Sequence, residues 1–332
     1  MMQQTFHQPR HLLARTTAVN RPLAFMILMM LLTIVAALIG LLANPSVITG
    51  APAWLKPLKF AVSISIYSAT FIWLLGFVQS HRRIAGIVAW VTTAGLLIEM
   101  ALIVMQVIRG TTSHFNVSTP FDGAVWSIMG VCIVGIWTAN LILGIVLLRQ
   151  RFADPAFGWA LRFSVFISLI GMGVAFFMTS PTAAQLTAAK AGNGLPISGA
   201  HSVGVADGGP GIPILGWSTV GGDLRAPHFV GLHALQLLPL FGWLVGRYGK
   251  KLETGTRKAL IGIAGFAYLG LVGLLTWQAL RGQSIIAPDA RTLVALAALI
   301  GIVTVSVVGV LFAARRATPT TYSTFGNSMH ST

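Results

Sequence analysis

The sequence predicts an all-α membrane protein, a bundle of eight transmembrane helices with both termini in the cytoplasm. Of its 332 residues, 55% are hydrophobic and only 9% are charged, whereas a soluble domain carries about 25% charged residues. Apolar runs of about 20 residues recur along the chain, and each is long enough to cross about 30 Å of hydrocarbon. Backbone groups in lipid must find hydrogen bonds within their own segment, so continuous runs of this length predict helices rather than barrel strands.

The apolar runs set the expected order of the elements. A cytoplasmic N-terminal tail, residues 1–22, precedes a transmembrane domain over 23–313, and a cytoplasmic C-terminal tail follows over 314–332. The predicted spans are 23–43, 58–78, 84–108, 123–148, 156–179, 227–246, 259–280 and 292–313.

The first apolar run, residues 23–43, is longer than the apolar core of a typical secretory signal. Signal peptides usually have an apolar core of only about 7–15 residues, so the length of the run 23–43 favours an uncleaved first span. Ala51-Pro52-Ala53 matches the small-residue pattern of a cleavage site, which leaves a cleaved leader as the alternative.

The distribution of cations predicts the orientation. With the N-terminus inside, the cytoplasmic segments hold fourteen of the 22 Lys and Arg residues and the outer segments hold seven, while Arg162 lies within the fifth span. Cytoplasmic loops carry the excess of Lys and Arg in membrane proteins. The net charge of +15 is therefore spread over short clusters between spans, and the lipid bilayer, not nucleic acid, is the partner we expect.

Two predicted outer loops are long, residues 109–122 and 180–226, and the second is rich in Gly and Pro. A long loop of this kind is either functional or loosely ordered. We therefore expect a functional site on the outer side of the membrane.

Glu99 is the clearest ionisable residue inside a predicted span. Thr92, Gly95 and Gln106 fall on the same helix face as Glu99, at spacings of three, four and seven residues. Ionisable groups in the membrane are costly and mark functional sites, so Glu99 is a candidate proton carrier or ligand-binding group, with Gln106 beside it. The alternative is a structural carboxyl that is neutral or paired with a neighbouring helix.

The second predicted span carries a polar stripe that includes Lys56, Lys59 and Tyr67. The two lysines lie at the helix N-terminus, where the dipole is already positive and favours anions. They need an anionic partner, which is either a specific ligand or a lipid phosphate. Asp223 and Arg225 precede the sixth span and could pair with each other or with these lysines.

Three histidines at outer helix ends, His114, His228 and His233, are candidate metal or haem ligands, because neutral imidazole is a common ligand of both. A spacing of five residues puts His228 and His233 about 140° apart on a helix, so one helix cannot direct both at one ion unless one of them lies in a frayed first turn. Gln236 shares a face with His233, and His201 in the long loop could supply another imidazole. The alternative is that these side chains are only hydrogen-bonded.

One acidic residue has a structural interpretation. Thr119-Pro120-Phe121-Asp122 matches a capping box, with proline at the first helical position and the acid at the third. We therefore expect Asp122 to cap the fourth span.

Three stretches, Trp54–Phe60 (WLKPLKF), Gln106–Asn116 (QVIRGTTSHFN) and Gly222–Gln236 (GDLRAPHFVGLHALQ), resemble an uncharacterised family of bacterial polytopic inner-membrane proteins. The resemblance implies a multi-pass location in the cell inner membrane and no activity.

These observations support three functional hypotheses. The first is a site near the outer surface that binds a small or anionic ligand, a metal ion or haem. The second is a proton-coupled transporter that uses Glu99, with Pro239 bending the sixth span. The third is a non-catalytic accessory or assembly protein, and the sequence leaves open whether the protein is an enzyme. The residues expected to line the site are Lys56, Lys59, Glu99, His114, Arg225, His228, His233 and Gln236.

Overall fold

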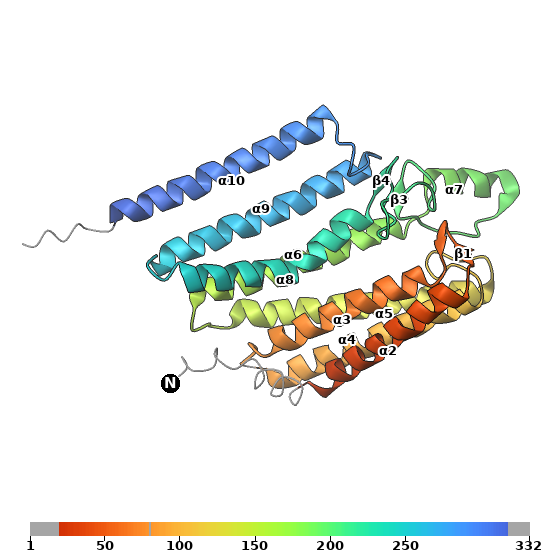
Figure 1. The fold of residues 1–332 in the computed structure, drawn as a ribbon, viewed down its shortest axis with the longest axis horizontal. Coiled ribbons are helices and arrows are strands. Elements are labelled where there is room, and N and C mark those ends of the chain that lie inside the picture. The colour runs from red at the N-terminus through yellow and green to blue at the C-terminus, as the bar shows by residue number, and fades with distance from the viewer. Residues whose placement is uncertain (1–19, 80, 318–332) are drawn as a thin grey trace, which may run out of the picture.

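The computed structural model describes residues 20–79 and 81–317, and this part of the chain contains eight helices long and apolar enough to cross a membrane. The helices lie side by side in one bundle (Figure 1). They are α2 (Arg21–Ala43), α3 (Leu55–Leu75), α4 (Arg82–Ile108), α5 (Pro120–Arg149), α6 (Pro155–Val174), α8 (Arg225–Tyr248), α9 (Thr254–Leu280) and α10 (Ala290–Ala317). The prediction of a multi-pass helical membrane protein is therefore confirmed, whereas most of each predicted tail lies outside the described residues.

Each helix begins one to five residues before the predicted span, and in α5 and α6 a capping side chain sets the start. Thr119 accepts a hydrogen bond from the amide of Asp122 at the start of α5. Asp154 accepts hydrogen bonds from two amides at the start of α6. In both helices a proline occupies the first turn, where its missing N–H costs nothing.

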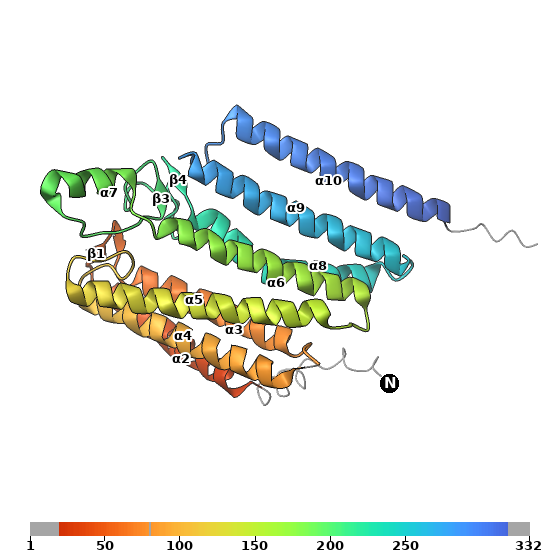
Figure 2. The ribbon, with the colours of Figure 1, turned by 180° about the vertical axis from the view of Figure 1, so that it is seen from behind.

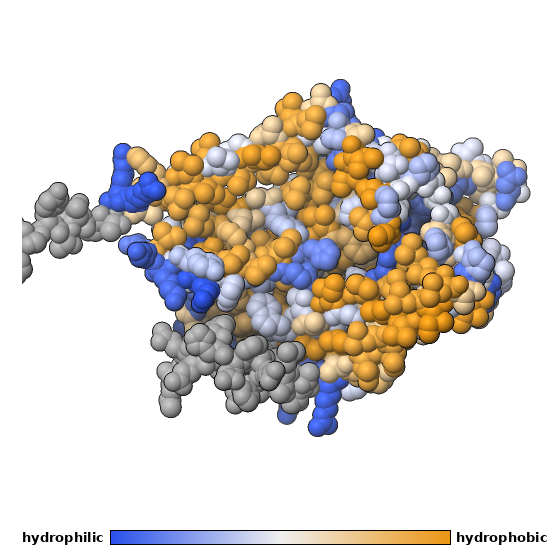
Figure 3. All heavy atoms as spheres, viewed as in Figure 1, coloured by the Kyte–Doolittle hydropathy of each residue, from blue (hydrophilic) through white to orange (hydrophobic). Residues whose placement is uncertain are grey.

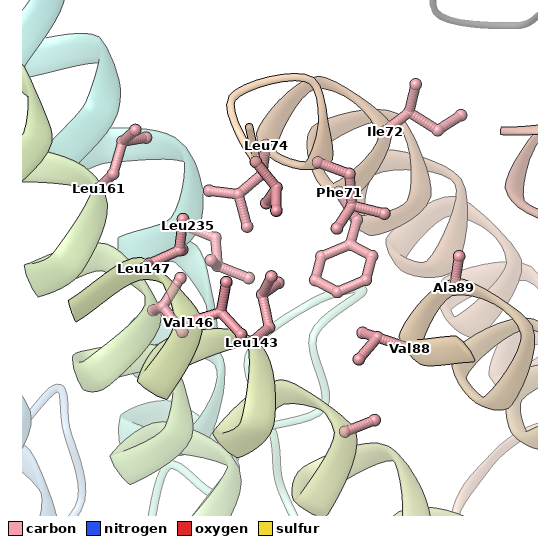
Figure 4. Packing of buried hydrophobic residues seen from close by; sticks show 14 of the residues in the cluster. Phe71, Ile72, Leu74, Val88, Ala89, Leu143, Val146, Leu147, Leu161 and Leu235 are labelled. Carbon is pink, nitrogen blue, oxygen red and sulfur yellow. The ribbon is translucent and has the colours of Figure 1, made fainter. Parts of the chain in front are cut away.

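The bundle has two groups of helices. Helices α2 to α5 pack together, α6 packs with α8 and α9, and α10 lies against α9 at the edge, while the contact between α5 and α6 joins the groups (Figures 1 and 2). A buried apolar cluster fills the junction (Figure 4). Its members include Phe71, Leu74, Leu143, Leu147, Leu161 and Leu235.

Helices α6 and α8 approach most closely at two glycines. A Cβ atom at Gly171 would lie 2.6 Å from the Cα atom of Gly231, so neither position has room for a larger residue. Small residues allow helix backbones to pack closely in membranes, where the hydrophobic effect does not drive association.

The loop between α6 and α8 carries several short elements. It contains a 3₁₀ turn (Ala175–Met178), α7 (Ala183–Ala188), a π turn (Ala189–Asn193) and the antiparallel strands β3 (Ser202–Val203) and β4 (Gly222–Asp223). A second hairpin, β1 (Val47–Ile48) and β2 (Ala51–Pro52), joins α2 to α3. The all-α prediction misses these two sheets, because strands of two residues are too short to show an alternating pattern.

The surface fits a lipid environment. In Figure 3, apolar residues cover much of the helical surface, and hydrophilic residues gather toward the two ends of the bundle. Side chains such as Leu32, Ile39, Ile87 and Ile302 are more than half exposed. These apolar side chains are removed from water if the helices face hydrocarbon.

Candidate functional site

Polar side chains from four segments meet at the end of the bundle that carries the four strands. Lys56 lies in the first turn of α3, Glu99 lies in α4, His114 follows α4, and His201 and Asp207 belong to the loop before α8. We call these five residues the polar cluster. The predicted association of Lys56, Glu99 and His114 is present in the structure.

The two loops of the polar cluster are joined by backbone hydrogen bonds. The amide of Ser198 donates to the carbonyl of Phe115 over 2.8 Å, and the amide of Val117 donates to the carbonyl of Pro196 over 2.9 Å. Gly199 (φ +117°) permits this approach, since a Cβ atom there would lie 2.7 Å from Cδ1 of Phe115. The pairing brings the rings of His114 and His201 to 6.5 Å between centroids.

His114 connects Lys56 to Glu99. The Nζ atom of Lys56 lies 3.1 Å from Nδ1 of His114. An ammonium group has donors only, so Nδ1 accepts, and the neutral ring carries its proton on Nε2. That nitrogen lies 3.5 Å from Oε1 of Glu99. The hydroxyl oxygen of Ser113 also lies 3.1 Å from Nδ1. A ring with partners at both nitrogens can take a proton on one side and release one on the other.

Glu99 is buried and incompletely paired. Its side chain is 2% exposed, and within the described part of the chain Oε2 has no hydrogen-bond partner. Most buried polar atoms in proteins have such a partner, because leaving one unpaired costs about 1–3 kcal/mol. The free oxygen of Glu99 is therefore a candidate contact for a ligand.

His114 is held in an apolar surrounding. The rings of Phe60 and Trp126 lie 5.7 and 5.6 Å from its ring, between centroids. Burial lowers the pKa of His114 well below its usual value, and the positive charge of Lys56 and the nearby His201 lower it further. His114 is therefore a neutral imidazole at neutral pH, as the contact with Lys56 requires.

Asp207 orients the second imidazole. One carboxylate oxygen, Oδ2, accepts from Nδ1 of His201 over 2.7 Å and from its amide over 3.0 Å, while Oδ1 accepts from the amide of Ser202 over 2.8 Å. A carboxylate only accepts, so Nδ1 carries the proton and Nε2 is the acceptor. Burial lowers the pKa of His201, although its hydrogen bond with Asp207 raises it.

The role of Asp207 was missed from the sequence. Burial raises the pKa of its carboxyl, but the hydrogen bonds from His201 and Ser202 outweigh this and hold the pKa below its usual range. In the sequence, Asp207 follows His201 by six residues in a glycine-rich loop. This pattern is too common to predict that the two side chains form a hydrogen bond.

Asp122 anchors the segment that carries His114. Its Oδ1 atom accepts from Gln106 over 2.9 Å and from Arg109, and its Oδ2 atom accepts from the hydroxyl of Thr119 over 2.6 Å. The predicted cap is confirmed for Thr119, but the carboxylate does not close the capping box because these donors occupy it. The structure thus places Gln106 beside Asp122 and gives it a structural partner.

Arg225 and Lys59 lie around a turn in the loop before α8. Arg225 donates to Asp223 through Nε over 2.9 Å and through Nη2 over 2.6 Å, so the pairing of these two residues is the one that forms. Lys59 donates to the carbonyl of Leu215 over 3.1 Å.

The remaining candidates have other partners. Tyr67 donates to Asn140 over 3.1 Å, and Gln236 donates to Thr70 over 3.0 Å; these bonds link α3 to α5 and to α8. His233 lies 3.3 Å from the side-chain oxygen of Gln236.

His228 is bound to the backbone of α6. Its Nδ1 atom lies 2.8 Å from the carbonyl oxygen of Gly171, next to the glycine contact. His114, His228 and His233 therefore have separate partners. In residues 20–79 and 81–317, no group of three or more His, Cys, Asp or Glu side chains could hold a metal ion, and the metal or haem site stays a prediction.

No protein-family model matches this chain, and neither curated proteins nor solved structures match it. Its function is inferred from the geometry of the polar cluster.

Proposed function

We propose that this integral membrane protein binds a small polar molecule beside Glu99 and exchanges a proton with it through His114. The observation that carries the proposal is the carboxyl of Glu99, which is 2% exposed and has an oxygen without a hydrogen-bond partner in the described part of the chain. A donor group of the ligand would supply that hydrogen bond. Its binding would remove the cost of the unpaired oxygen.

In this proposal the proton moves along Lys56, His114 and Glu99, which lie in sequence through the contacts of the His114 ring. Lys56 donates a proton to Nδ1 of His114, whose Nε2 proton passes to Oε1 of Glu99. The ring is left as its other tautomer, and the protonated carboxyl serves as a general acid toward the ligand. The same steps in reverse let Glu99 accept a proton from the ligand.

The proposal includes the orientation. We infer that both termini face the cytoplasm and that the polar cluster lies at the extracytoplasmic side of a bacterial inner membrane. The cation bias supports this, because Arg82, Arg149, Arg247 and Arg257 lie at the ends of their helices that are remote from the strands. The bacterial inner membrane is proposed only from the resemblance of three stretches noted in the sequence.

A comparison of two glutamine variants tests the proposal. Glu99→Gln removes the proton-exchanging group and keeps its shape, and Glu253→Gln is the matched control at the exposed start of α9. Purified proteins in mild detergent are screened with small alcohols, amines, carboxylic acids and quinones by thermal unfolding. We expect at least one compound to raise the melting temperature of the wild type and of Glu253→Gln but not of Glu99→Gln.

A screen in which no compound stabilises the wild type more than Glu99→Gln would contradict the proposal. The visible spectrum and metal content of the same preparations test the earlier hypothesis. A haem band or a stoichiometric metal that is lost in His114→Gln would replace the proton-exchange function with a metal or haem function.

A further inference from the structure

We propose that Lys59 and Arg225 form a phosphate-binding site at the edge of the polar cluster, which makes the ligand a phosphate-bearing molecule. The inference rests on the proposed function only for the idea that a ligand binds nearby. The site itself is built from residues that the proton exchange does not use.

The two cations converge on one point. A Cβ atom built on Gly216 would lie 3.8 Å from Nη1 of Arg225 and 3.8 Å from Nζ of Lys59. Gly216 has a backbone φ of +72°, which favours glycine, so no side chain occupies the space between the two positive groups. Both cations therefore lie on the side of Gly216 where a side chain would project, and an oxyanion that packs against this side would lie beside both.

Arg225 and Lys59 each keep N–H donors that no described residue uses. Arg225 spends Nε and Nη2 on Asp223 and on the carbonyl of Gly216, and no described residue accepts a hydrogen bond from its Nη1 atom. Lys59 spends one of its three protons on the carbonyl of Leu215. Up to four N–H groups therefore remain for the oxygens of a phosphate.

The local charge also favours an anion. Asp223 balances Arg225, but Lys59 forms no ion pair with any residue of 20–79 and 81–317 and is only partly buried. Lys59 also lies in the first turns of α3, whose N-terminus has no side-chain cap and adds partial positive charge. A phosphate would balance the unpaired charge.

The turn that carries the site is held in place. The amide of Gly216 donates to the carbonyl of Ile212 over 2.7 Å, and the amide of Ile212 donates to the carbonyl of Trp217 over 2.8 Å. The amide of Leu224, which precedes Arg225, donates to the carbonyl of His201 over 3.0 Å, which places Arg225 close to the polar cluster. A phosphate held here would put the rest of a small molecule within reach of the cluster.

The phosphate could belong to a soluble molecule or to a lipid head group, and the experiment separates the two. Thermal unfolding is measured in detergent with inorganic phosphate against chloride at equal ionic strength. The proteins are the wild type, Lys59→Gln, Lys59→Arg and the control Lys190→Gln, which removes the same charge from an exposed position on the same side. Native mass spectrometry of protein from phosphatidylglycerol nanodiscs measures retained lipid.

We expect inorganic phosphate to stabilise the wild type, Lys59→Arg and Lys190→Gln, and to bind Lys59→Gln about tenfold more weakly. If retained phosphatidylglycerol is lost in Lys59→Gln and displaced by phosphate, the source is the lipid; if phosphate binds without displacing lipid, it is a soluble molecule. Equal responses to phosphate in all four proteins would overturn the proposal. Glu99→Gln should keep the phosphate response, so a failure at Glu99 is distinguishable from a failure at Lys59.

Discussion

Glu99 and Asp122 are buried carboxyl groups at the same end of the bundle, and their surroundings differ in one respect. Both side chains are nearly inaccessible, with exposures of 2% and 4%. Asp122 accepts from Gln106, Arg109 and Thr119, so that both of its oxygens are paired. Glu99 has one contact at 3.5 Å and one oxygen without a partner among the described residues.

The comparison shows that burial alone does not separate a structural acid from a reactive one. A carboxylate with several donors is held in place and stabilised in its ionised form. A buried carboxyl without them is costly to the fold, and its unpaired oxygen can still accept a proton or a hydrogen bond. The number of donors, and not the depth, distinguishes the two acids, and it agrees with a structural role for Asp122 and with the proposed proton-exchanging role of Glu99.

The largest effect is expected at Asp122. Asp122→Ala removes the acceptor of four side-chain donors and leaves the charge of Arg109 unpaired, so we expect a loss of about 2–4 kcal/mol in unfolding free energy. Unfolding in detergent by heat or by SDS measures the loss. Glu99→Gln should change stability by less than about 1 kcal/mol; an equal loss in the two variants would mean that Glu99 is structural as well.

A smaller loss of unfolding free energy is expected at Asp207. This carboxyl also has several donors but lies in a loop, so it extends the comparison of Glu99 with Asp122. Asp207→Asn replaces an acceptor of His201 and Ser202 with an amide that has only one acceptor oxygen. We expect a loss of about 1–2 kcal/mol in unfolding free energy, measured in the same way. Asp289→Asn, at an ion pair whose carboxyl is 36% exposed, is the control and should lose less; a larger loss there would argue that Asp207 contributes little to the fold.

The smallest effect concerns pH and His114, which faces Lys56, Glu99 and His201. Its pKa in the folded protein lies below the usual value, so the unfolded chain binds more protons as the pH falls below about 6.5. The contribution of His114 to the unfolding free energy is therefore fully present above that pH and is lost below it. The loss amounts to about 1 kcal/mol at pH 5.5.

Melting temperatures measured at about pH 7.5 and pH 5.5 test whether the protein loses stability on acidification. The decline on acidification should be smaller in His114→Gln than in the wild type, because glutamine does not titrate. Part of the decline should persist in the variant, since the pKa of His201 is lowered as well. A decline of the same size in both proteins would show that His114 is not held neutral by the fold.

Hydropathy was sufficient to predict the eight spans and their order, and the capping residue Thr119 was predicted as well. These features are local, because each helix in lipid satisfies its own backbone hydrogen bonds and needs only a long apolar run. The sequence also identified Lys56, Glu99 and His114 as candidates, since ionisable groups stand out against an apolar background.

The tertiary structure alone decided which of the candidates meet. Lys56 and His114 are 58 residues apart in sequence, and their contact depends on the path of two paired loops. The structure gave His228 and His233 separate partners and added Asp207, which no local pattern predicted. Side-chain partners depend on distances between segments, and composition and spacing carry no information on those distances.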